Sequence, residues 1–493
     1  MSKYTELSVK VKIGLRSFIT VIAILVTVLI AVGVLTYVIP AGKYTIYTTD
    51  ESKINQPFYQ YTEDEALNKQ IVIDSYRVLT DEENTSRIPI YRWLTSPIEA
   101  LLFGSNNANM IMIIALLLVL GGTFKVLEKS GGLVSLVRVI MTKLKSKRFV
   151  AIWAITAVIM ILSAVFGLQE QLLILYPVFA MLCTVLNWSS FTAISFILIA
   201  SGVGFTTAIT NPLTIGTASI AAGTSVVDGL WYRCIIFCVM YVLTSLFLTY
   251  LAKKDEKRAV NKFDEQGFVL VSEEEHKEDI RKATMIIVLF SIALLSVIIT
   301  TSIKSLRSLA MVFMAVAFIV GTVIVGRKLL GSYKELGKSF LEGVKDVLPS
   351  IVIIMIAFGI TYIAQQGNIL HTIFHYFYNS VTNISPYFAV IILYAFVLII
   401  EFFIPSASAK AVLIIPMLTL APIEGISVTV IILTYLFADG YTNVLYPTCG
   451  TLLVGLGLAN VSFAQWFKKT ILFQLLLMVI SIGFLMLAVF IGL

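Results

Sequence analysis

Four ionisable residues lie within apolar stretches of the sequence, and their side chains are the best suited to chemistry. They are Glu170, Glu401, Lys410 and Asp439. An ionised side chain in hydrocarbon is strongly unfavourable, so each of them indicates either a functional site or a buried partner. A carboxylate can bind a guanidinium or ammonium group, hold a cation or exchange a proton, and an ammonium can bind a carboxylate. The four residues therefore predict a site for small charged solutes and ions.

The four residues differ in their surroundings and in their expected roles. Glu170 falls in FGLQEQ, a polar break in an apolar stretch, where it can pair with a cationic solute or exchange a proton. Asp439 is expected to hold a coupling cation or to neutralise Lys410. Lys410 is expected to bind a substrate carboxylate, to pair with Asp439, or to extend its ammonium toward the interface. Glu401 is expected to cap a helix or pair locally, and to matter less to function than Glu170.

Uncharged polar residues accompany these charges in stretches rich in Gly and Pro, which break helices. The two longest are GFTTAITNPLTIGT, from Gly204 to Thr217, and GYTNVLYPTCGT, from Gly440 to Thr451. Their oxygens and amides suit the backbone of an amino acid or a hard cation. The substrate-binding candidates are Gln169, Glu170, Gln171, Thr206, Thr207, Asn211, Ser406, Ser408, Lys410 and Asn443. The candidates for coupling to Na⁺ or H⁺ are Asp439, Thr442 and Thr448.

Transmembrane helices are the elements predicted to position these side chains. The chain has 493 residues, of which 58% are hydrophobic and 13% charged, a composition that indicates a polytopic membrane protein. The first apolar stretch is longer than that of a signal peptide and predicts an uncleaved helix. The apolar stretches lie at 17–39, 107–127, 149–165, 190–223, 230–251, 283–302, 308–326, 348–366, 387–403, 427–458 and 470–492.

Basic residues beside these stretches predict the orientation of the chain. Lysines and an arginine before residue 17 place the N-terminus in the cytoplasm, and the basic turn between Lys125 and Arg148 lies on the same side. The crossings are then consistent only if 149–187 and 387–421 each enter and leave by one side, as re-entrant hairpins. The predicted divisions are an N-terminal transmembrane helix at 1–40, an extracytoplasmic segment at 41–98, a first transport repeat at 99–251, a cytoplasmic linker at 252–282, scaffold helices with a cytoplasmic turn at 283–346, and a second, inverted repeat at 347–493.

An internal similarity supports two inverted halves. TIGTASIAAG, from Thr214 to Gly223, aligns with TCGTLLVGLG, from Thr448 to Gly457. A hairpin and a broken helix in each half are typical of secondary transporters whose site lies near the middle of the bilayer. The alternative is that Gly and Pro only kink two helices whose neighbours satisfy the backbone. The predicted fold is an all-α polytopic membrane protein with inverted repeats, two re-entrant hairpins and two discontinuous transmembrane helices.

Several motifs resemble the C4-dicarboxylate anaerobic carrier family. YVIPAGKY, the NP that precedes T-x-G-T-A, IPSASAKA and ADGYTNVLYPTCG match it in order along nearly the whole chain, most closely in the branch of YfcC-like proteins and arginine/ornithine antiporters. The resemblance implies the ion-transporter superfamily architecture, with a scaffold and a moving transport domain, often in a homodimer. The chain departs from that branch at Gln171, where an acid is usual, and at Lys410, where a neutral residue is usual.

The function predicted is secondary active transport of a small amino acid by alternating access, through exchange or an ion gradient. Three acids against one lysine favour a basic amino acid such as arginine or ornithine. Lys410 and the helix termini leave a C4-dicarboxylate or a peptide-like anion open. A channel or an intramembrane enzyme is the alternative of another class, although no Walker loop, dinucleotide fingerprint or nucleophile elbow occurs in its expected context.

Few other partners are expected. The basic residues lie in short loops, which argues for orientation in a bilayer and against nucleic acid. His371 and His375 lack a third ligand at helical spacing, so an external amphipathic helix is favoured over a zinc site. The four cysteines are interpreted as packing residues, and no cofactor is expected. The expected location is the bacterial cytoplasmic membrane.

Overall fold

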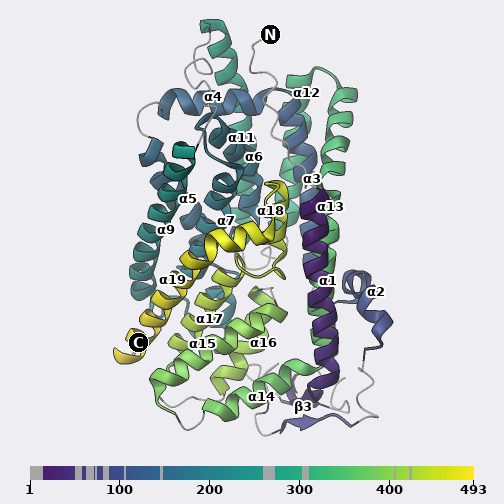
Figure 1. Cartoon of the computed structure of the whole chain (residues 1–493), viewed down its shortest axis with the longest axis vertical. Coiled ribbons are helices and arrows are strands. Elements are labelled where there is room, and N and C mark those ends of the chain that lie inside the picture. Colours follow the sequence, from purple (N-terminus) through teal and green to yellow (C-terminus); the bar gives the residue numbers. More distant parts are fainter. Residues whose placement is uncertain are drawn as a thin grey trace.

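The protein folds as an elongated bundle of helices (Figure 1). The computed structural model describes residues 15–49, 58–62, 72, 75–80, 88–104, 107–144, 148–258, 272–302, 310–381, 384–404, 407–420 and 425–493. Seven helices in this part of the chain are long and apolar enough to cross a membrane, which agrees with the predicted polytopic membrane protein. They are Met110–Lys129, Arg148–Phe166, Leu230–Arg258, Val312–Leu330, Tyr333–Gln366, Pro386–Phe403 and Phe463–Phe490.

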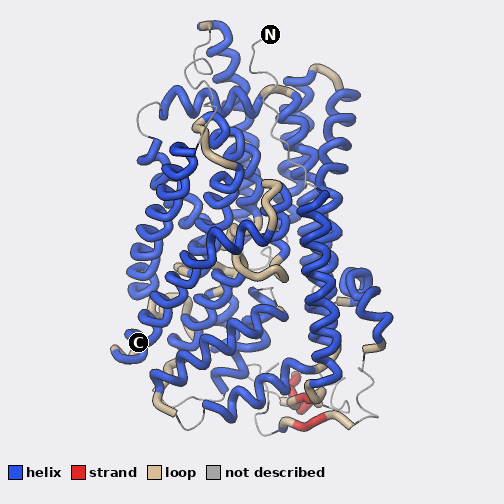
Figure 2. Tube along the Cα trace, in the orientation of Figure 1, coloured by secondary structure: helices blue, strands red, loops and turns tan. Residues whose placement is uncertain are grey.

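Short strands lie at the end of the molecule drawn at the bottom of Figure 2. Strand β1 (Gly42–Lys43) pairs with β4 (Arg77–Val78) in antiparallel register, and β2 (Ile46–Thr48) pairs with β3 (Tyr59–Tyr61) in parallel register. Strand β1 packs against α14, so the strands and α14 share this end. The helices outside the two halves described next are α1 (Leu15–Val38), α2 (Ile90–Phe103), α3 (Asn107–Lys129), α4 (Gly132–Leu144), α11 (Glu273–Ser302), α12 (Ala310–Leu330), α13 (Tyr333–Gln366) and α14 (Ile369–Val381).

Two sets of helices repeat the same order of lengths and breaks. The first set is α5 (Arg148–Phe166), the 3₁₀ helix η3 (Gln171–Leu175), α6 (Tyr176–Val185), α7 (Ser190–Thr206), α8 (Ile215–Ala222) and α9 (Leu230–Arg258). The second set is α15 (Pro386–Phe403), α16 (Ala407–Leu420), α17 (Val428–Thr442), α18 (Gly450–Leu458) and α19 (Phe463–Phe490). Helix α5 packs on α7 and α9, and α15 packs on α17 and α19. Both predicted helix breaks are present, between α7 and α8 and between α17 and α18.

Each set begins with a segment that returns to the end from which it started. Arg148 at the start of α5 and Trp188 after α6 both contact Glu256, at 3.4 Å and 3.0 Å. In the second set, Gly425 after α16 lies so close to Pro386 at the start of α15 that a Cβ at Gly425 would clash with the Pro386 ring. The two ends of each segment therefore lie together.

Helices α7 and α17 form the centre of the bundle, where nearly every residue is buried. Two glycines allow their backbones to approach. A Cβ at Gly440 would overlap the hydroxyl and the backbone nitrogen of Thr206, and a Cβ at Gly202 would lie 2.5 Å from a methyl group of Val444. Small residues at such crossings permit close packing of helices in membranes. The ends of the two broken helices therefore touch each other.

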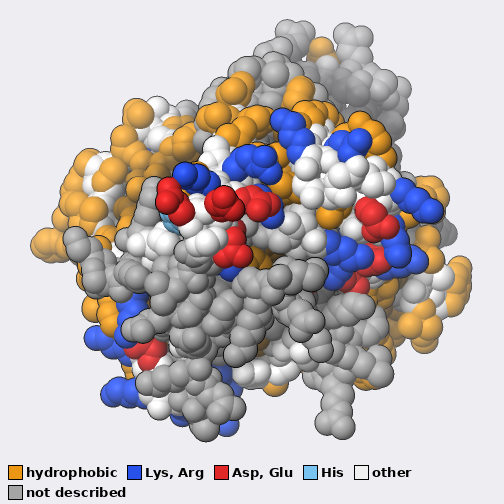
Figure 3. Space-filling model, turned by 90° about the horizontal axis from the view of Figure 1, so that it is seen from above, with side chains coloured by type: hydrophobic (Ala, Val, Ile, Leu, Met, Phe, Trp, Pro, Cys, Tyr) orange, Lys and Arg blue, Asp and Glu red, His pale blue; other side chains and the backbone are white. Residues whose placement is uncertain are grey.

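Several segments that the sequence predicts as turns, linkers or loops are helical. Helix α4 occupies the predicted basic turn and lies across the top of Figure 1, where Arg138 forms a buried ion pair of 2.5 Å with Asp279 of α11. Helix α9 continues to Arg258, inside the predicted linker, and 259–271 lie outside the described residues. Helix α2 begins inside the predicted extracytoplasmic segment. Figure 3, seen from the top of Figure 1, shows Lys, Arg, Asp and Glu side chains on this end and hydrophobic side chains around its edge.

Candidate functional site

The first helix break is closed mainly by backbone hydrogen bonds. The amide nitrogens of residues 209–211 all donate to the carbonyl oxygen of Ala164 at the end of α5, over 2.9–3.2 Å. The side-chain oxygen of Asn211 accepts from the nitrogen of Leu213 at 2.8 Å, which forms an Asx turn. Gly167, with φ of +75°, leaves room for the Asn211 side chain. The amides of residues 209–211 and of Leu213 therefore have uncharged acceptors within the chain, while the Ala208 carbonyl accepts from the Arg233 side chain at 3.5 Å.

The second helix break lies beside a buried ion cluster. The Lys410 ammonium donates to Glu401 and, at 2.5 Å, to Asp439, and none of the three is more than 1% exposed. The Thr442 hydroxyl lies 3.3 Å from the Glu401 carboxylate oxygen that also contacts Lys410. The other oxygens of Glu401 and Asp439 have no partner. Two carboxylates against one ammonium leave a formal charge of −1 if all three are ionised, and a buried cluster of this kind calls for a further positive partner.

The tip of the first returning segment reaches the second break. Gln169 accepts a hydrogen bond of 3.1 Å from the Asn443 side chain. Glu170 lies beside the Thr451 side chain in the first turn of α18, and one of its carboxylate oxygens is buried without a partner. The free N–H groups of a helix N-terminus favour a carboxylate. Residues far apart in the sequence, from both sets of helices, therefore meet at one place.

The other predicted site residues differ in whether their side chains have hydrogen-bond partners. The hydroxyls of Thr206 and Thr207 donate back to the carbonyls of their own helix, at 3.0 Å and 2.9 Å. Three further candidates keep a buried side-chain atom without a partner: Gln171, Asn211 and Thr448. Ser406 and the side chain of Ser408 lie outside the described residues. The structure thus brings Gln169, Glu170, Lys410, Asp439, Thr442 and Asn443 to the second break, and Asn211 with the two threonines to the first.

Two residues contribute more than the sequence indicates. Glu401 was expected to cap or pair locally, and it does pair with Lys410, but it thereby joins the cluster with Asp439. The sequence signal for this pair is the spacing: Glu401 precedes Lys410 by nine residues, and the two lie on consecutive helices, α15 and α16. Thr451 was not a candidate, because its contact with Glu170 depends on the packing of distant segments. The Tyr435 ring lies 5.7 Å from the Lys410 ammonium and adds a cation–π contact.

The two histidines of α14 connect this helix to the strand end of the molecule. The Tyr44 backbone nitrogen donates to Nδ1 of His371 at 3.2 Å, and the Tyr44 hydroxyl lies 3.1 Å from Nδ1 of His375. The His375 ring stacks on Tyr76 with centroids 4.0 Å apart. Within the described residues, no group of three or more His, Cys, Asp or Glu side chains is arranged to hold a metal ion.

A cavity lies near the tip of the first returning segment. It is lined by α3 and α13 on one side and by η3, α6 and α18 on the other. Lys125, Glu128 and Asp346 supply its charges, with Lys125 3.0 Å from Glu128 and 3.8 Å from Asp346. Leu173 of η3 forms part of the wall, three residues after Glu170. The cavity therefore extends between the outer helices and the tip that carries Glu170.

Sequence comparison identifies a family across nearly the whole chain. Residues 18–490 match the family model DcuC, described as C4-dicarboxylate anaerobic carrier. An Escherichia coli protein named "Putative basic amino acid antiporter YfcC" is 24% identical over 472 residues, covering 91% of each chain. An uncharacterized protein of Haemophilus influenzae is 22% identical over 492 residues, covering 92% of this chain and 93% of its own.

Solved structures give weaker likenesses over similar lengths. The YdaH transporter of Alcanivorax borkumensis aligns with a TM-score of 0.42 and 14% identity, covering 97% of this chain and 98% of its own. MtrF of Neisseria gonorrhoeae aligns with a TM-score of 0.40 and 14% identity, covering 96% and 95%. Scores this low establish no shared fold.

Proposed function

Because the chain belongs to the C4-dicarboxylate anaerobic carrier family, a family of transporters, we propose that it is a secondary active transporter for a basic amino acid such as arginine or ornithine. The observation that carries this proposal is the charge balance at the second break, where Glu401 and Asp439 share the ammonium of Lys410 and Glu170 adds a third carboxyl group nearby. A cationic side chain would compensate this excess of carboxylates. The name of the Escherichia coli relative supports the same substrate class.

A C4-dicarboxylate is the second candidate, because the family description names it. A dicarboxylate requires cationic groups that are available for its two carboxylates. Lys410 supplies an ammonium at the break, and it already contacts two protein carboxylates. A dicarboxylate would have to displace one of them, whereas a basic amino acid would add the missing positive charge.

Proteoliposomes containing the purified protein test the substrate. Labelled arginine, ornithine, lysine, succinate and fumarate are offered separately, with and without a Na⁺ or pH gradient. We expect saturable arginine uptake that internal ornithine accelerates, since exchange is the leading mode. Uptake of succinate without uptake of any basic amino acid would transfer the proposal to the second candidate. Ion flux that never saturates would indicate a channel, and chemical alteration of the solute would indicate an enzyme.

We propose that the two sets of helices are inverted repeats and that the returning segments are re-entrant hairpins. Several observations support this arrangement: the equivalent packing within the two sets, the shared contacts at Glu256 and Pro386, and the position of α4 and α14 across opposite ends of Figure 1. In this proposal the chain crosses the bacterial inner membrane several times, and its N-terminus lies on the cytoplasmic side. The chain can form a homodimer. Cysteines at Ser406 and Trp188 should react with impermeant reagents from opposite sides, and labelling from one side alone would contradict the proposal.

We propose further that Asp439, with Thr442 and Thr448, couples transport to Na⁺ or H⁺. Asp439 has one buried carboxylate oxygen without a partner, and the Thr448 hydroxyl is also unpartnered. Such oxygens suit a hard cation or a proton. Asp439→Asn should abolish the dependence of uptake on the ion gradient while part of the exchange activity remains. Unchanged ion dependence would reject the coupling role, and loss of exchange as well would make Asp439 a substrate contact.

A further inference from the structure

Arg233 is a buried arginine whose charge is not neutralised by an ion pair among the described residues. It lies in the first turn of α9 and is 4% exposed. Its guanidinium donates to the carbonyl oxygens of Val226, Asp228 (3.4 Å) and Ala208 (3.5 Å), while its Nε–H has no partner. Carbonyl dipoles solvate a cation but leave its net charge in a medium of low dielectric constant. A negatively charged partner would therefore stabilise Arg233.

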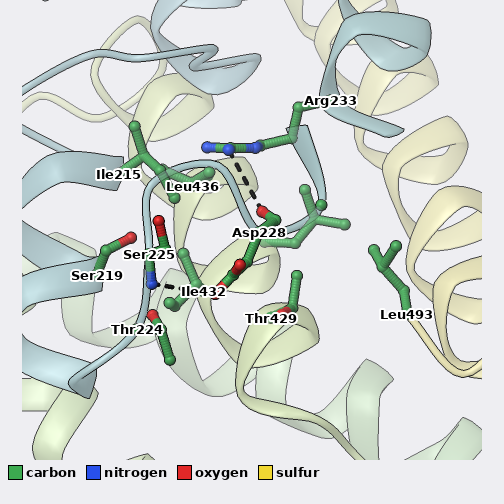
Figure 4. Close-up of a pocket in the computed structure, with 12 residues that line it drawn as sticks. Ile215, Ser219, Thr224, Ser225, Asp228, Arg233, Thr429, Ile432, Leu436 and Leu493 are labelled. Atoms are coloured by element: carbon green, nitrogen blue, oxygen red, sulfur yellow. Dashed lines mark hydrogen bonds between the residues drawn. The ribbon is translucent and has the colours of Figure 1, made fainter. Parts of the chain in front are cut away.

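A small cavity is lined by this arginine and by two further unpartnered donors (Figure 4). The cavity, of about 10 Å³, is lined by α8, the loop after it, the start of α9, α17 and the C-terminal Leu493. The hydroxyls of Ser219 and Thr224 line it, and neither has a hydrogen-bond partner. Ser219 is only 1% exposed. A cavity of this volume has room for about one water-sized group.

One acidic residue also lines the cavity, and its position limits its effect on the site. Asp228 lies in the exposed loop, where its carboxylate accepts a hydrogen bond of 3.0 Å from the Ser225 nitrogen. Its contact with Arg233 is through the backbone carbonyl, which Figure 4 marks with a dashed line. Asp228 therefore does not form an ion pair with the guanidinium that would complete the arginine's coordination.

We propose that the cavity binds one small monovalent anion, with chloride as the reference ligand, between the Arg233 guanidinium and the hydroxyls of Ser219 and Thr224. The anion would accept from the free Nε–H and both hydroxyls, and it would neutralise the buried charge. Arg233 also contacts Ala208, in the first helix break, so the anion is held beside that break. The proposal does not depend on which solute the protein transports.

Thermal unfolding of the full-length protein in lipid nanodiscs tests the site without a transport assay. Chloride replaces gluconate at constant ionic strength, because gluconate is too large for the cavity. We expect the wild-type Tm to rise with saturation, by about 3 °C. Ser219→Ala should raise the chloride midpoint about tenfold, since one hydrogen bond to the anion is lost. Ser245→Ala removes another buried, unpartnered hydroxyl, farther along α9, and should leave the midpoint unchanged.

Two results would overturn the proposal. The first is an equal wild-type Tm in the two salts across the titration. The second is a chloride response in Arg233→Gln that matches the wild type. If Arg233→Gln does not fold, Ser219→Ala decides the question, because a midpoint equal to that of Ser245→Ala excludes the site.

Discussion

The break between α7 and α8 is closed mainly by backbone hydrogen bonds, with one contact from Arg233 to the Ala208 carbonyl, whereas the break between α17 and α18 lies beside a cluster of ionisable side chains. In the first, one backbone oxygen of Ala164 accepts from three consecutive amides. In the second, Lys410 joins Glu401 and Asp439, and Glu170 approaches from the other set of helices. Backbone hydrogen bonds do not depend on ions in solution, while paired charges respond to any cation that enters. The second break is therefore the one suited to recognise a charged solute, and the first is suited to hold the structure.

The two breaks are also in contact, which connects their different chemistry. Gly440 at the end of α17 packs directly on Thr206 at the end of α7. A rearrangement at the charged break would therefore have to be accommodated at Thr206. Variants that affect one break and not the other test how far this division of roles extends.

The largest effect is expected from removing the ammonium of the charged break. Lys410→Met leaves Glu401 and Asp439 buried together without a counter-charge, which should cost about 3–5 kcal/mol and reduce the yield of folded protein. Size-exclusion chromatography and thermal unfolding in detergent measure this loss.

A neutral replacement of the whole cluster provides the control. The triple variant Lys410→Met, Glu401→Gln, Asp439→Asn should regain most of the Tm, because no unpaired charge remains, but it should not transport. A triple variant no more stable than Lys410→Met would mean that packing, and not charge, decides the stability of this break.

The second-largest effect, on uptake, is expected from replacing Glu170, with Glu401 as the comparison. Glu170→Gln should lower uptake by about tenfold or more, since a charged contact with the solute is lost, without loss of folded protein. Glu401→Gln should lower uptake less, because Lys410 and Asp439 remain as a neutral pair. Uptake by the two variants, normalised to reconstituted protein, decides between the acids, and equal losses would show that Glu170 holds no special role.

A smaller effect is expected at the first break, between α7 and α8. Asn211→Ala removes the acceptor for the Leu213 nitrogen and should lower the free energy of unfolding by about 1 kcal/mol. The ion dependence of uptake should stay as in the wild type. Asn443→Ala is the matched change at the charged break. If Asn211→Ala altered the ion dependence as much as Asn443→Ala does, the contrast between the two breaks would be wrong.

The smallest effect, on local stability, is expected at His371. This side chain is buried in its neutral form, unlike the paired charges at the second break. Burial, with a contribution from Lys43, lowers the pKa of His371 to about 4, so the ring stays neutral and accepts from the Tyr44 amide. Because this pKa lies below the ordinary value of about 6.5, the stability that the neutral ring contributes is fully present above that pH and is lost progressively as pH falls toward 4. The protection factor of the Tyr44 amide, which corrects for the intrinsic pH dependence of hydrogen exchange, should fall over this range. His371→Gln should remove the pH dependence, and identical profiles would contradict the assignment.

The positions of the breaks follow from the sequence because their signals are local. Gly, Pro, Asn and Thr within apolar stretches predict an interruption wherever they occur, and both interruptions are found. The bounds of the other helices are harder to predict from the sequence. Helix α4 lies in a segment that the basic residues predict to be a cytoplasmic turn. Packing against α6 and α11 stabilises this segment as a helix. Long-range packing outweighed the local signal there.

The sequence by itself determined that the chain is a membrane protein of this family, with polar side chains concentrated at two breaks. The composition and the order of the motifs are sufficient for this, because a segment in the hydrocarbon core can satisfy its backbone hydrogen bonds in few ways. Only the tertiary structure decided the partners: Ala164 for the first break, Glu401 and Asp439 together for Lys410, and the second break for Glu170. The energy of a buried charge depends on which groups lie within a few ångströms of it, and segments far apart in the sequence supply those groups.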